Sequence, residues 1–396
     1  MTSIMRNIFI TGLTILLMIS CKDDPTSIGE QLIPEGDKIS IFESNSLDNN
    51  FDQKSKTYRD TDELSFASRV LLGIHDQSKF TSLTKYTMAI PDSISSAVDS
   101  GKLVISRSWM ELPVDYRLGD MSAPYSFTIH EITSSWTAIG FNVDSLAQLQ
   151  YESKNLASNI VQEGDSLITL DFDNAIIMKW IEQIMEGDFI NIPGIISIPE
   201  MSSQKVLGFR AITSSTPESG IPTIYSIVEV TGEFTDTLVA IPFSDIYVPE
   251  GPDIVQKEGR IYIQGANIFR SNLSFDLTSL PKDITVNNSV LKLYVDESES
   301  LLGTAGTDSM VVYSIQDSAA MALDTLSRTR LLRKENYFEG ALTTITQVIL
   351  ARGENQGFNL RLEQELSTAN KIAFYGSDAE DRALRPLLTI IYTKKN

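Results

Sequence analysis

The stretch that decides the fold is Leu273-Ser-Phe-Asp-Leu-Thr-Ser-Leu-Pro281. Apolar and polar side chains alternate along it, which is the period of a β-strand with one buried face. A proline-marked turn follows, and then the apolar run Leu291-Lys-Leu-Tyr-Val295. Because Arg260-Ile-Tyr-Ile-Gln-Gly-Ala-Asn267 comes before both runs, this region predicts three successive strands joined by short turns.

The same order of elements occurs earlier in the chain. Its three strands are Arg69-Val-Leu-Leu-Gly-Ile-His-Asp76, Leu83-Thr-Lys-Tyr-Thr-Met-Ala-Ile-Pro91-Asp-Ser-Ile94 and Lys102-Leu-Val-Ile105. Later segments also correspond: 125–132 with 309–315, 205–212 with 371–375, and 222–228 with 386–392. Seven elements in matching order indicate an internal duplication.

Each copy also contains one amphipathic segment with helical spacing. In the first copy Asp173 is a suitable N-cap, Gly187 ends the segment, and the apolar face is Ile176, Ile177, Trp180, Ile181 and Ile184. In the second copy Gly353 ends the segment, and the apolar stripe is Leu342, Ile345, Val348 and Ile349. We therefore expect one short covering helix in each copy.

These patterns predict an all-β protein with two tandem jelly-roll-like β-sandwiches. We expect a lipoprotein signal peptide at 1–20, a lipidated cysteine with an N-terminal segment at 21–56, and sandwiches at 57–231 and 236–396. The junction near Gly232 to Thr237 is short, so the two sandwiches should be close neighbours.

Cys21 is the single cysteine of the chain and follows the apolar run 8–20. That run holds about a dozen residues, whereas a membrane-spanning helix needs roughly 20. Arg6 precedes it, and Ser20 stands directly before the cysteine, as in a secretory signal with a small residue at its cleavage site. The alternative is an ordinary signal peptide or a buried apolar segment with a chance cysteine.

The composition limits the range of partners. A formal charge of −20 opposes binding to nucleic acid and to anionic lipid. Disulfides cannot stabilise a chain with a single cysteine. Membrane attachment is therefore expected to come from the acyl chains of a lipid anchor, such as palmitate.

The segment from Ser27 to Phe42 differs from a flexible linker, which is poor in large apolar residues. It contains Ile28, Leu32, Ile33, Ile39, Ile41 and Phe42. We expect it to add a strand to the first sandwich. The alternative is that it docks on a partner.

A search for catalytic motifs gives little. The two histidines, His75 and His130, are on different predicted strands, and no zinc, phosphate-binding or nucleophile-elbow motif is present. Asp171 and Asp173 flank Phe172 before the first predicted helix. Asp173 is expected to cap this helix, and the alternative is a carboxylate pair for glycoside cleavage. Asp296-Glu297-Ser298-Glu299 is expected to be a solvated loop, with structural calcium as the alternative. We otherwise expect no cofactor and no metal site.

Exposed aromatic rings are the residues that stack on sugars, so they define a candidate ligand patch. Trp136 and Trp180 occupy patterned positions and are expected in the core. Trp109 lies at a strand end, and three neighbours complete the candidate patch: Tyr116, Arg117 and Tyr125. The alternative for Trp109 is packing.

The repeats resemble the DNRLRE-type jelly roll, which is related to an alginate-type carbohydrate-binding module. The second copy carries the resemblance through four runs: Asp245-Ile-Tyr-Val248, Arg260-Ile-Tyr-Ile-Gln-Gly265, Ser274-Phe-Asp-Leu-Thr-Ser-Leu-Pro281 and Leu291-Lys-Leu-Tyr-Val295. In the first copy His130-Glu-Ile-Thr-Ser-Ser-Trp136 resembles a strand ending in a Ser-Trp pair. The eponymous string itself is absent, so the resemblance concerns the fold pattern.

The N-terminal region resembles bacterial lipoproteins, in which the cysteine thiol is lipidated and becomes the mature N-terminus. Lys22-Asp23-Asp24 resembles the signal by which Bacteroidota-type bacteria send lipoproteins to the outer face of the outer membrane. The alternative is the periplasmic-facing leaflet. The run from Cys21 to Ile39 resembles the opening of a Bacteroidota lipoprotein family of unknown function, numbered 4270, which implies no activity.

These features together favour a non-enzymatic, lipid-anchored, surface-exposed outer-membrane protein with a binding or scaffolding role. One version is a glycan-binding or adhesion module. The second is an accessory subunit of an outer-membrane protein complex, and the third is a polysaccharide-cleaving enzyme, because a pair of carboxylates suffices for glycoside cleavage.

Overall fold

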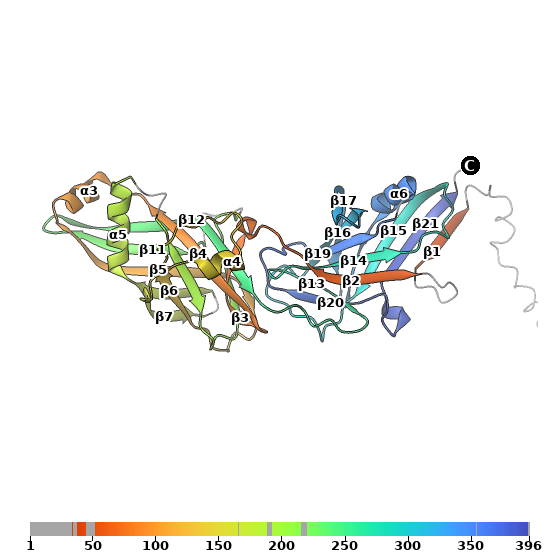
Figure 1. Cartoon of the computed structure of the whole chain (residues 1–396), viewed down its shortest axis with the longest axis horizontal. Helices are drawn as coiled ribbons and strands as arrows, with labels where there is room; N and C mark the ends of the chain where they lie inside the picture. Colours follow the sequence, from red (N-terminus) through yellow and green to blue (C-terminus); the bar gives the residue numbers. More distant parts are fainter. Residues whose placement is uncertain are drawn as a thin grey trace, which may run out of the picture.

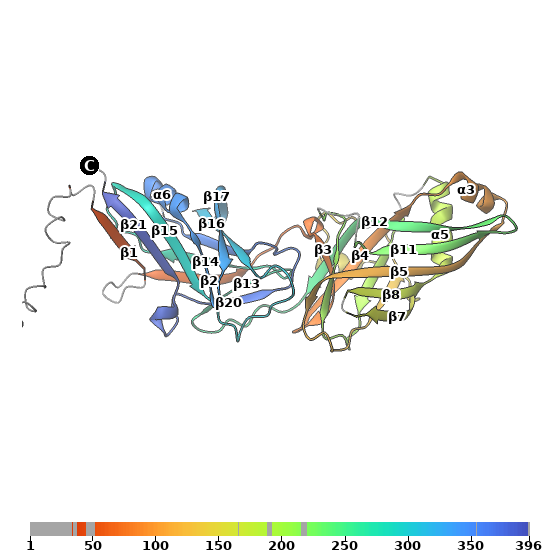
Figure 2. The same ribbon diagram turned by 180° about the vertical axis from the view of Figure 1, so that it is seen from behind.

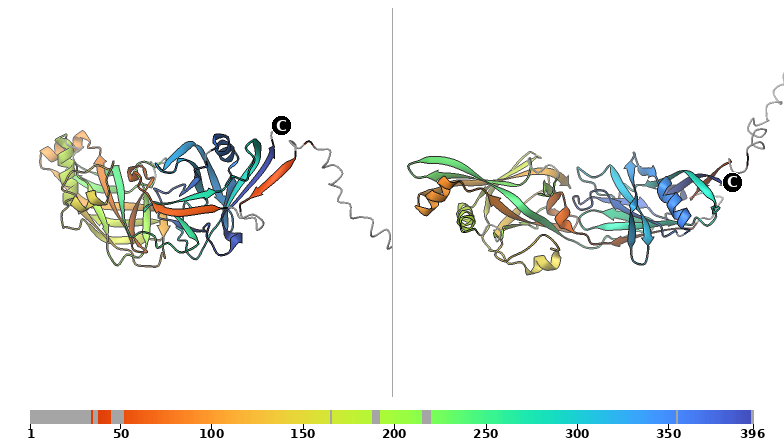
Figure 3. Two further views of the ribbon diagram at one scale, coloured as in Figure 1. Left: turned by 45° about the vertical axis from the view of Figure 1, so that its right-hand side comes forward. Right: turned by 90° about the horizontal axis from the view of Figure 1, so that it is seen from above.

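The computed structural model describes residues 34, 38–44, 52–164, 166–187, 192–214, 220–353 and 355–394. They form two β-sandwiches that lie end to end (Figure 1). The view from behind and two further views show the same elongated arrangement (Figures 2 and 3). Strands dominate and the helices are short, so the prediction of an all-β fold with two sandwiches is confirmed.

The first sandwich occupies residues 64–250. Its strands are β3 (Arg69–His75), β4 (Ser78–Met88), β5 (Leu103–Leu118), β6 (Phe127–Glu131), β7 (Ala157–Glu163), β8 (Leu167–Phe172), β9 (Ile195–Pro199), β10 (Val206–Arg210), β11 (Thr223–Val230) and β12 (Phe234–Glu250). Its helices are the 3-10 helix η2 (Leu64–Phe66), α3 (Asp92–Asp99), α4 (Val143–Gln148) and α5 (Asn174–Met185). The predicted helix is α5, and α3 and α4 are additional.

The second sandwich combines an N-terminal segment with residues 260–394. Its strands are β1 (Ile39–Glu43), β2 (Gln53–Arg59), β13 (Arg260–Gln264), β14 (Phe269–Phe275), β15 (Ile284–Tyr294), β16 (Ser309–Asp317), β17 (Ala322–Arg333), β18 (Tyr337–Ala341), β19 (Phe358–Leu362), β20 (Lys371–Tyr375) and β21 (Leu387–Lys394). Its helices are α6 (Thr343–Arg352) and the 3-10 helix η4 (Arg382–Leu384).

One antiparallel pairing scheme describes both sandwiches. β3 pairs with β10 as β13 pairs with β20, and β4 pairs with β9 as β14 pairs with β19. β5 pairs with β8 and β11, as β15 pairs with β18 and β21. The matched order of elements in the sequence therefore corresponds to a matched order of strands in space.

In each sandwich, part of the sheet is formed by a strand that stands in the sequence directly before the other repeat. β12 pairs with β11 up to Ala240 and with β4 from Ala240 onward. In the second sandwich β1 pairs with β21 and β2 pairs with β14. Since β1 and β2 precede the first repeat and β12 precedes the second, the two repeats have exchanged their leading strands.

This exchange corrects three expectations. Residues 39–43 of the N-terminal segment do form a strand, but it joins the second sandwich and not the first. The run from Asp245 to Val248, expected to open the second sandwich, pairs with β4 in the first. The expected junction at 232–237 lies in the β11–β12 hairpin, so the chain passes to β13 only after Glu250.

The helix predictions hold at the level of individual side chains. Asp173 caps α5, because its carboxylate accepts a hydrogen bond from the Ala175 N–H at 2.8 Å. Trp180 is fully buried and stacks on Tyr86 at 6.0 Å between ring centres, and Trp136 is also buried, so both tryptophans lie in the core as expected. Gly353 ends α6 in the left-handed conformation that glycine adopts without strain.

A small buried cluster, separate from the main core of each sandwich, spans the boundary between them. Tyr116 and Tyr247 of the first sandwich pack in one cluster with Ala266 and Ala369 of the second. The Tyr116 hydroxyl donates to Asn370 Oδ1 at 3.0 Å and accepts from the Ala369 N–H at 3.1 Å. The Tyr247 hydroxyl donates to the Leu366 carbonyl at 2.7 Å. Because these polar atoms are buried and satisfied, they fix one relative placement of the sandwiches.

The exchange predicts which fragments of the second sandwich fold. The β21–β1 pair brings Ile39 opposite Thr393, just as the β11–β12 hairpin brings Phe234 opposite Val230. A fragment holding 251–394, a short glycine linker and then 38–60 should therefore give a cooperative thermal transition by circular dichroism. The fragment 251–394 alone should not, because β14 and β21 would expose unpaired edges. Equal cooperativity of the two fragments would contradict the exchange.

Asp245 on the exchanged strand β12 predicts a pH-dependent stability. Burial raises the pKa of its carboxyl to about 6, although the Ile212 N–H donates to it at 2.8 Å. As the pH rises from about 4 to 6, the Asp245 carboxyl loses its proton in the unfolded chain but keeps it in the folded chain. The free energy of unfolding therefore falls over this range and is constant at higher pH. About two pKa units correspond to about 3 kcal/mol at neutral pH.

Replacement of Asp245 by asparagine keeps the acceptor for Ile212 and removes this charge. Melting temperatures measured across pH should show a small gain for Asp245→Asn near pH 4 and a larger, constant gain above about pH 6. A gain that is independent of pH would argue against ionisation of Asp245 as the cause.

Candidate functional site

A network of polar side chains covers the outward face of one sheet in the second sandwich. In one row across five strands, Lys56 lies opposite Asn272, Asn272 opposite Asn359, Asn359 opposite Tyr313, and Tyr313 opposite Arg328. The adjacent row contains Tyr58, Arg270, Arg361, Val311 and Arg330. We call these two rows the polar face.

Asn359 is the centre of the polar face. Its Nδ2 donates to the Tyr58 hydroxyl and to Asn272 Oδ1, both at 2.9 Å, and its Oδ1 accepts from Arg361 Nε at 3.0 Å. The Asn359 side chain has no exposed surface, so its hydrogen bonds are shielded from water. Each neighbour is consequently held in one orientation before any ligand arrives.

Arg270 anchors the second row. Its guanidinium contacts Asp60, lies 2.7 Å from Asp62 Oδ2, and lies 2.7 Å from Glu365 Oε1. Burial alone would lower the pKa of Arg270, but Glu365 and the neighbouring carboxylates outweigh burial and raise it. Burial, followed by the charge of Asp60, raises the pKa of the Tyr58 hydroxyl, so Tyr58 stays a neutral hydrogen-bonding group at physiological pH.

Two arginines hold Tyr313 at the other end of the face. The Arg361 guanidinium lies over the Tyr313 ring, 4.8 Å from its centre, and Arg328 donates to the Tyr313 hydroxyl at 3.4 Å. Lys56 and Arg328 at the two ends of the first row are exposed, whereas Asn272 and Tyr313 are half-buried. This row contains two basic residues and no acid, in a chain whose formal charge is −20.

The first sandwich has an apolar surface at the equivalent position. The corresponding row is Ile246, Leu83, Ile196 and His130. Its apolar members pack with Trp136 and Ala138, and residues of α4 cover them. The same pairing scheme therefore carries a covered apolar layer in one sandwich and an open polar face in the other.

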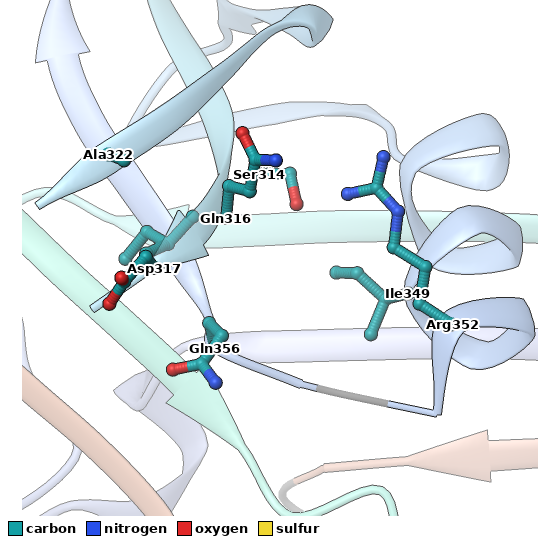
Figure 4. A pocket seen from close by; sticks show the side chains of 8 residues that line it. Ser314, Gln316, Asp317, Ala322, Ile349, Arg352 and Gln356 are labelled. Carbon is teal, nitrogen blue, oxygen red and sulfur yellow. The ribbon is translucent and has the colours of Figure 1, made fainter. Parts of the chain in front are cut away.

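A pocket of about 600 Å³ lies beside α6, at the end of β16 (Figure 4). Its lining residues are Ser314, Ile315, Gln316, Asp317, Ala322, Ile349, Arg352 and Gln356. Most of these residues are polar, and the apolar ones are Ile315, Ala322 and Ile349, so the pocket is more polar than most small-molecule sites.

The predicted aromatic patch is not brought together. Tyr116 is fully buried between the sandwiches, and the backbone of Arg117 is hydrogen-bonded to Thr304. Tyr125 packs on Phe127 at the edge of the first core, with 5.5 Å between ring centres. The Tyr116 ring is therefore taken up by the interface between the sandwiches and the Tyr125 ring by the edge of the first core, while Arg117 is half-buried, so the two tyrosine rings do not form an exposed stacking surface.

Trp109 is half-buried on β5, between Tyr225 of β11 and Asp171 of β8. It belongs to the sheet in which β12, β11, β5 and β8 are neighbours (Figure 2). Its ring stacks on Tyr225, with 5.1 Å between centres, and the Arg107 guanidinium lies 5.2 Å from its centre. Its Nε1 donates to Glu111 at 3.0 Å. Since neighbouring side chains occupy the ring faces, Trp109 offers mainly its edge to a ligand.

The acidic segment 296–299 forms a turn that is only partly solvated. Asp296 is buried and lies 2.6 Å from Arg260 Nε, whereas Glu297, which pairs with Arg333, and Ser298 are exposed. Glu299 is half-buried and pairs with Lys257. In the part of the chain that the structure describes, no group of three or more His, Cys, Asp or Glu is arranged to hold a metal ion. Both histidines are half-buried, as expected of strand residues.

Cys21, Lys22, Asp23 and Asp24 lie outside the described residues. Among the helices that the structure describes, none combines the length and apolar character needed to span a membrane. The chain matches no protein-family model, no curated protein and no solved structure.

The polar face was missed by a sequence search that looked for exposed aromatic rings. Its signal lies in the alternation of β19 and β14, where Asn359 and Arg361, and Arg270 and Asn272, occupy outward positions. A comparison of the two copies at those positions would have found it, because the first copy has Leu83 and Ile196 where the second has asparagines.

Proposed function

We propose that this chain is a non-enzymatic glycan-binding module, held at the outer membrane by a lipid on Cys21, which binds an acidic polysaccharide across the polar face. The row from Lys56 to Arg328 is the observation that carries the proposal. It crosses five strands, so it extends for about 19 Å at ~4.8 Å per interstrand step. That shape suits an extended polymer better than a compact ligand.

The chemistry of the row suits sugar hydroxyls and carboxylates. Amide, phenol and guanidinium groups donate and accept hydrogen bonds in fixed directions, and the guanidinium group suits carboxylates in particular. Lys56 and Arg328 add positive charge at both ends of a row without acids. The remaining surface of a strongly acidic chain would repel an anionic polymer, which favours binding at this face.

The proposal is for binding without catalysis. The carboxylates beside the polar face, Asp60, Asp62 and Glu365, are held in ion pairs with Arg270, and the first row contains no carboxylate or imidazole to donate or accept a proton. The polysaccharide-cleaving alternative makes a different prediction, the release of new reducing ends from a bound polymer.

The position of the N-terminal strand is consistent with display from a membrane. β1 lies at the end of the second sandwich that faces away from the first (Figure 1). A lipid on Cys21 would therefore place the second sandwich near the membrane and the first sandwich away from it. Lys22-Asp23-Asp24 supports the outer face of the outer membrane as the location.

A second candidate function, an accessory subunit of an outer-membrane protein complex, is favoured by a different surface. On β12 the side chains of Val239, Ile241 and Phe243 are exposed to 40%, 44% and 36%. Three large apolar side chains at alternate positions of one strand would suit a protein partner better than a sugar.

Binding to polysaccharide tests the polar face. The protein from Lys22 onward should be retarded in affinity gels containing a polyuronate, more strongly at low salt. The double variant Lys56→Ala/Arg328→Ala should bind at least about tenfold more weakly, because charged hydrogen bonds contribute roughly 1.5–3 kcal/mol each. Lys102→Ala is the matched control, since Lys102 is exposed on the first sandwich and pairs with Glu233.

Three outcomes would contradict the glycan proposal. Equal retardation of the double variant and the control would remove the polar face as the site. The accessory-subunit function would be favoured by two results together: no acidic or neutral polysaccharide binds, and a membrane protein is recovered in a pull-down with the unaltered protein but not with a variant of Ile241. Release of reducing ends would favour the enzyme.

The anchor has its own test. Cys21→Ala should move the protein from the membrane fraction to the soluble fraction and abolish labelling by a lipid-precursor analogue, since acyl chains are expected to supply the attachment. Equal membrane retention of the variant and the unaltered protein would refute lipidation at Cys21.

A further inference from the structure

The pocket beside α6 contains a buried hydroxyl without a partner. Ser314 is 1% exposed, and its Oγ has no hydrogen-bond partner. The hydroxyl points into the pocket, toward the space between Ile349 and Arg352 (Figure 4). A buried polar atom that is left unpaired costs free energy, so a group that pairs with it on binding gains an advantage.

The first sandwich shows what fills this position when no ligand is needed. Ser314 lies opposite Phe358, just as Glu131 lies opposite Ile195. The next residue of each strand donates its N–H to a glycine carbonyl at 3.0 Å, from Ile315 to Gly357 in one case and from Ile132 to Gly194 in the other. Glu131 is therefore the equivalent of Ser314, and its carboxylate contacts Lys179 of α5.

The covering helices differ in the same way. In α5 the buried residues are Ile176, Ile177, Trp180 and Ile181, and in α6 they are Ile345, Thr346 and Ile349. This spacing makes Ile349 the equivalent of Trp180. The second sandwich thus has Ile349 in place of Trp180 and Ser314 in place of Glu131. Both side chains are smaller, and the pocket occupies the space that is left.

We propose that this pocket binds one neutral sugar unit of hexose size. Its volume of about 600 Å³ is within the range of ~300–1,000 Å³ that is usual for ligand sites. Ile315, Ala322 and Ile349 supply the apolar part of the lining, which suits the C–H groups of a sugar ring. The polar rim contains a hydroxyl, two amides, a guanidinium and a carboxylate, which together offer donors and acceptors to several sugar hydroxyls.

Internal contacts hold the rim in position and set its charge. Arg352 lies 3.0 Å from Asp324 Oδ2, and Asp317 Oδ1 accepts from the N–H groups of Ala319 and Ala320 at 2.8 and 3.1 Å. Gln356 Oε1 accepts from the Ser318 hydroxyl at 2.6 Å, which orients its amide. Two carboxylates against one guanidinium disfavour an anionic ligand, so the rim suits a neutral one.

This pocket shares no residue with the polar face, so the inference does not rest on polymer binding there. Titration of the protein from Lys22 onward with D-glucose, D-galactose and D-mannose, followed by ligand-observed NMR, should detect binding of at least one hexose. Ile349→Trp restores the first sandwich's residue and should weaken binding at least tenfold. The matched control, Lys102→Ala on the exposed surface of the first sandwich, should bind the hexose like the unaltered protein.

Ser314→Glu is a second variant that fills the pocket, independently of Ile349→Trp. Hexose binding is compared only for variants whose thermal transition matches that of the unaltered protein. Loss of hexose binding in either folded variant supports the pocket. The inference is overturned if no hexose binds, if both filled variants bind as well as the unaltered protein, or if gluconate binds more tightly than every neutral hexose.

Discussion

The antiparallel pairing of three exchanged strands is the interaction on which the rest of the structure depends. β12 pairs with β4 and β11 in the first sandwich, and β1 and β2 pair with β21 and β14 in the second. Without these strands, both sandwiches would present unpaired backbone N–H and C=O groups along exposed edges. Each leading strand pairs within the sandwich of the other repeat. The chain therefore crosses the boundary between the sandwiches twice, after β2 and after β12.

The boundary itself strengthens this connection. Tyr116 and Tyr247 are buried there with their hydroxyls hydrogen-bonded to the second sandwich, and a β-carbon on Gly303 would lie 2.4 Å from the Tyr116 ring. Only glycine permits that approach. The exchange also determines the composition of the polar face, because β2 brings Lys56 and Tyr58 beside Asn272 and Arg270. A segment that precedes the first sandwich thereby becomes part of a surface on the second.

The two sandwiches share one pairing scheme but carry different surfaces. The row of Ile246, Leu83 and Ile196 is apolar and covered in the first sandwich, whereas the equivalent row in the second is polar, with Lys56 exposed, Asn272 half-buried and Asn359 buried. The helix cap at Asp173 and the buried Trp180 could be predicted because capping and helical period are local properties. The aromatic patch could not, since the exposure of Tyr116 depends on a partner surface 254 positions away.

The sequence by itself determined the elements: the period-two alternation of the strands, the apolar faces of α5 and α6, and the repetition of their order. Each of these depends on residues a few positions apart, which the chain presents directly. Only the tertiary structure decided which sandwich receives β1, β2 and β12, and hence which side chains meet on the polar face. Two sandwiches with the same scheme offer the same free edges to a leading strand, so local patterns are equally compatible with either pairing. The choice depends on contacts such as Lys56 beside Asn272, between residues more than 200 positions apart.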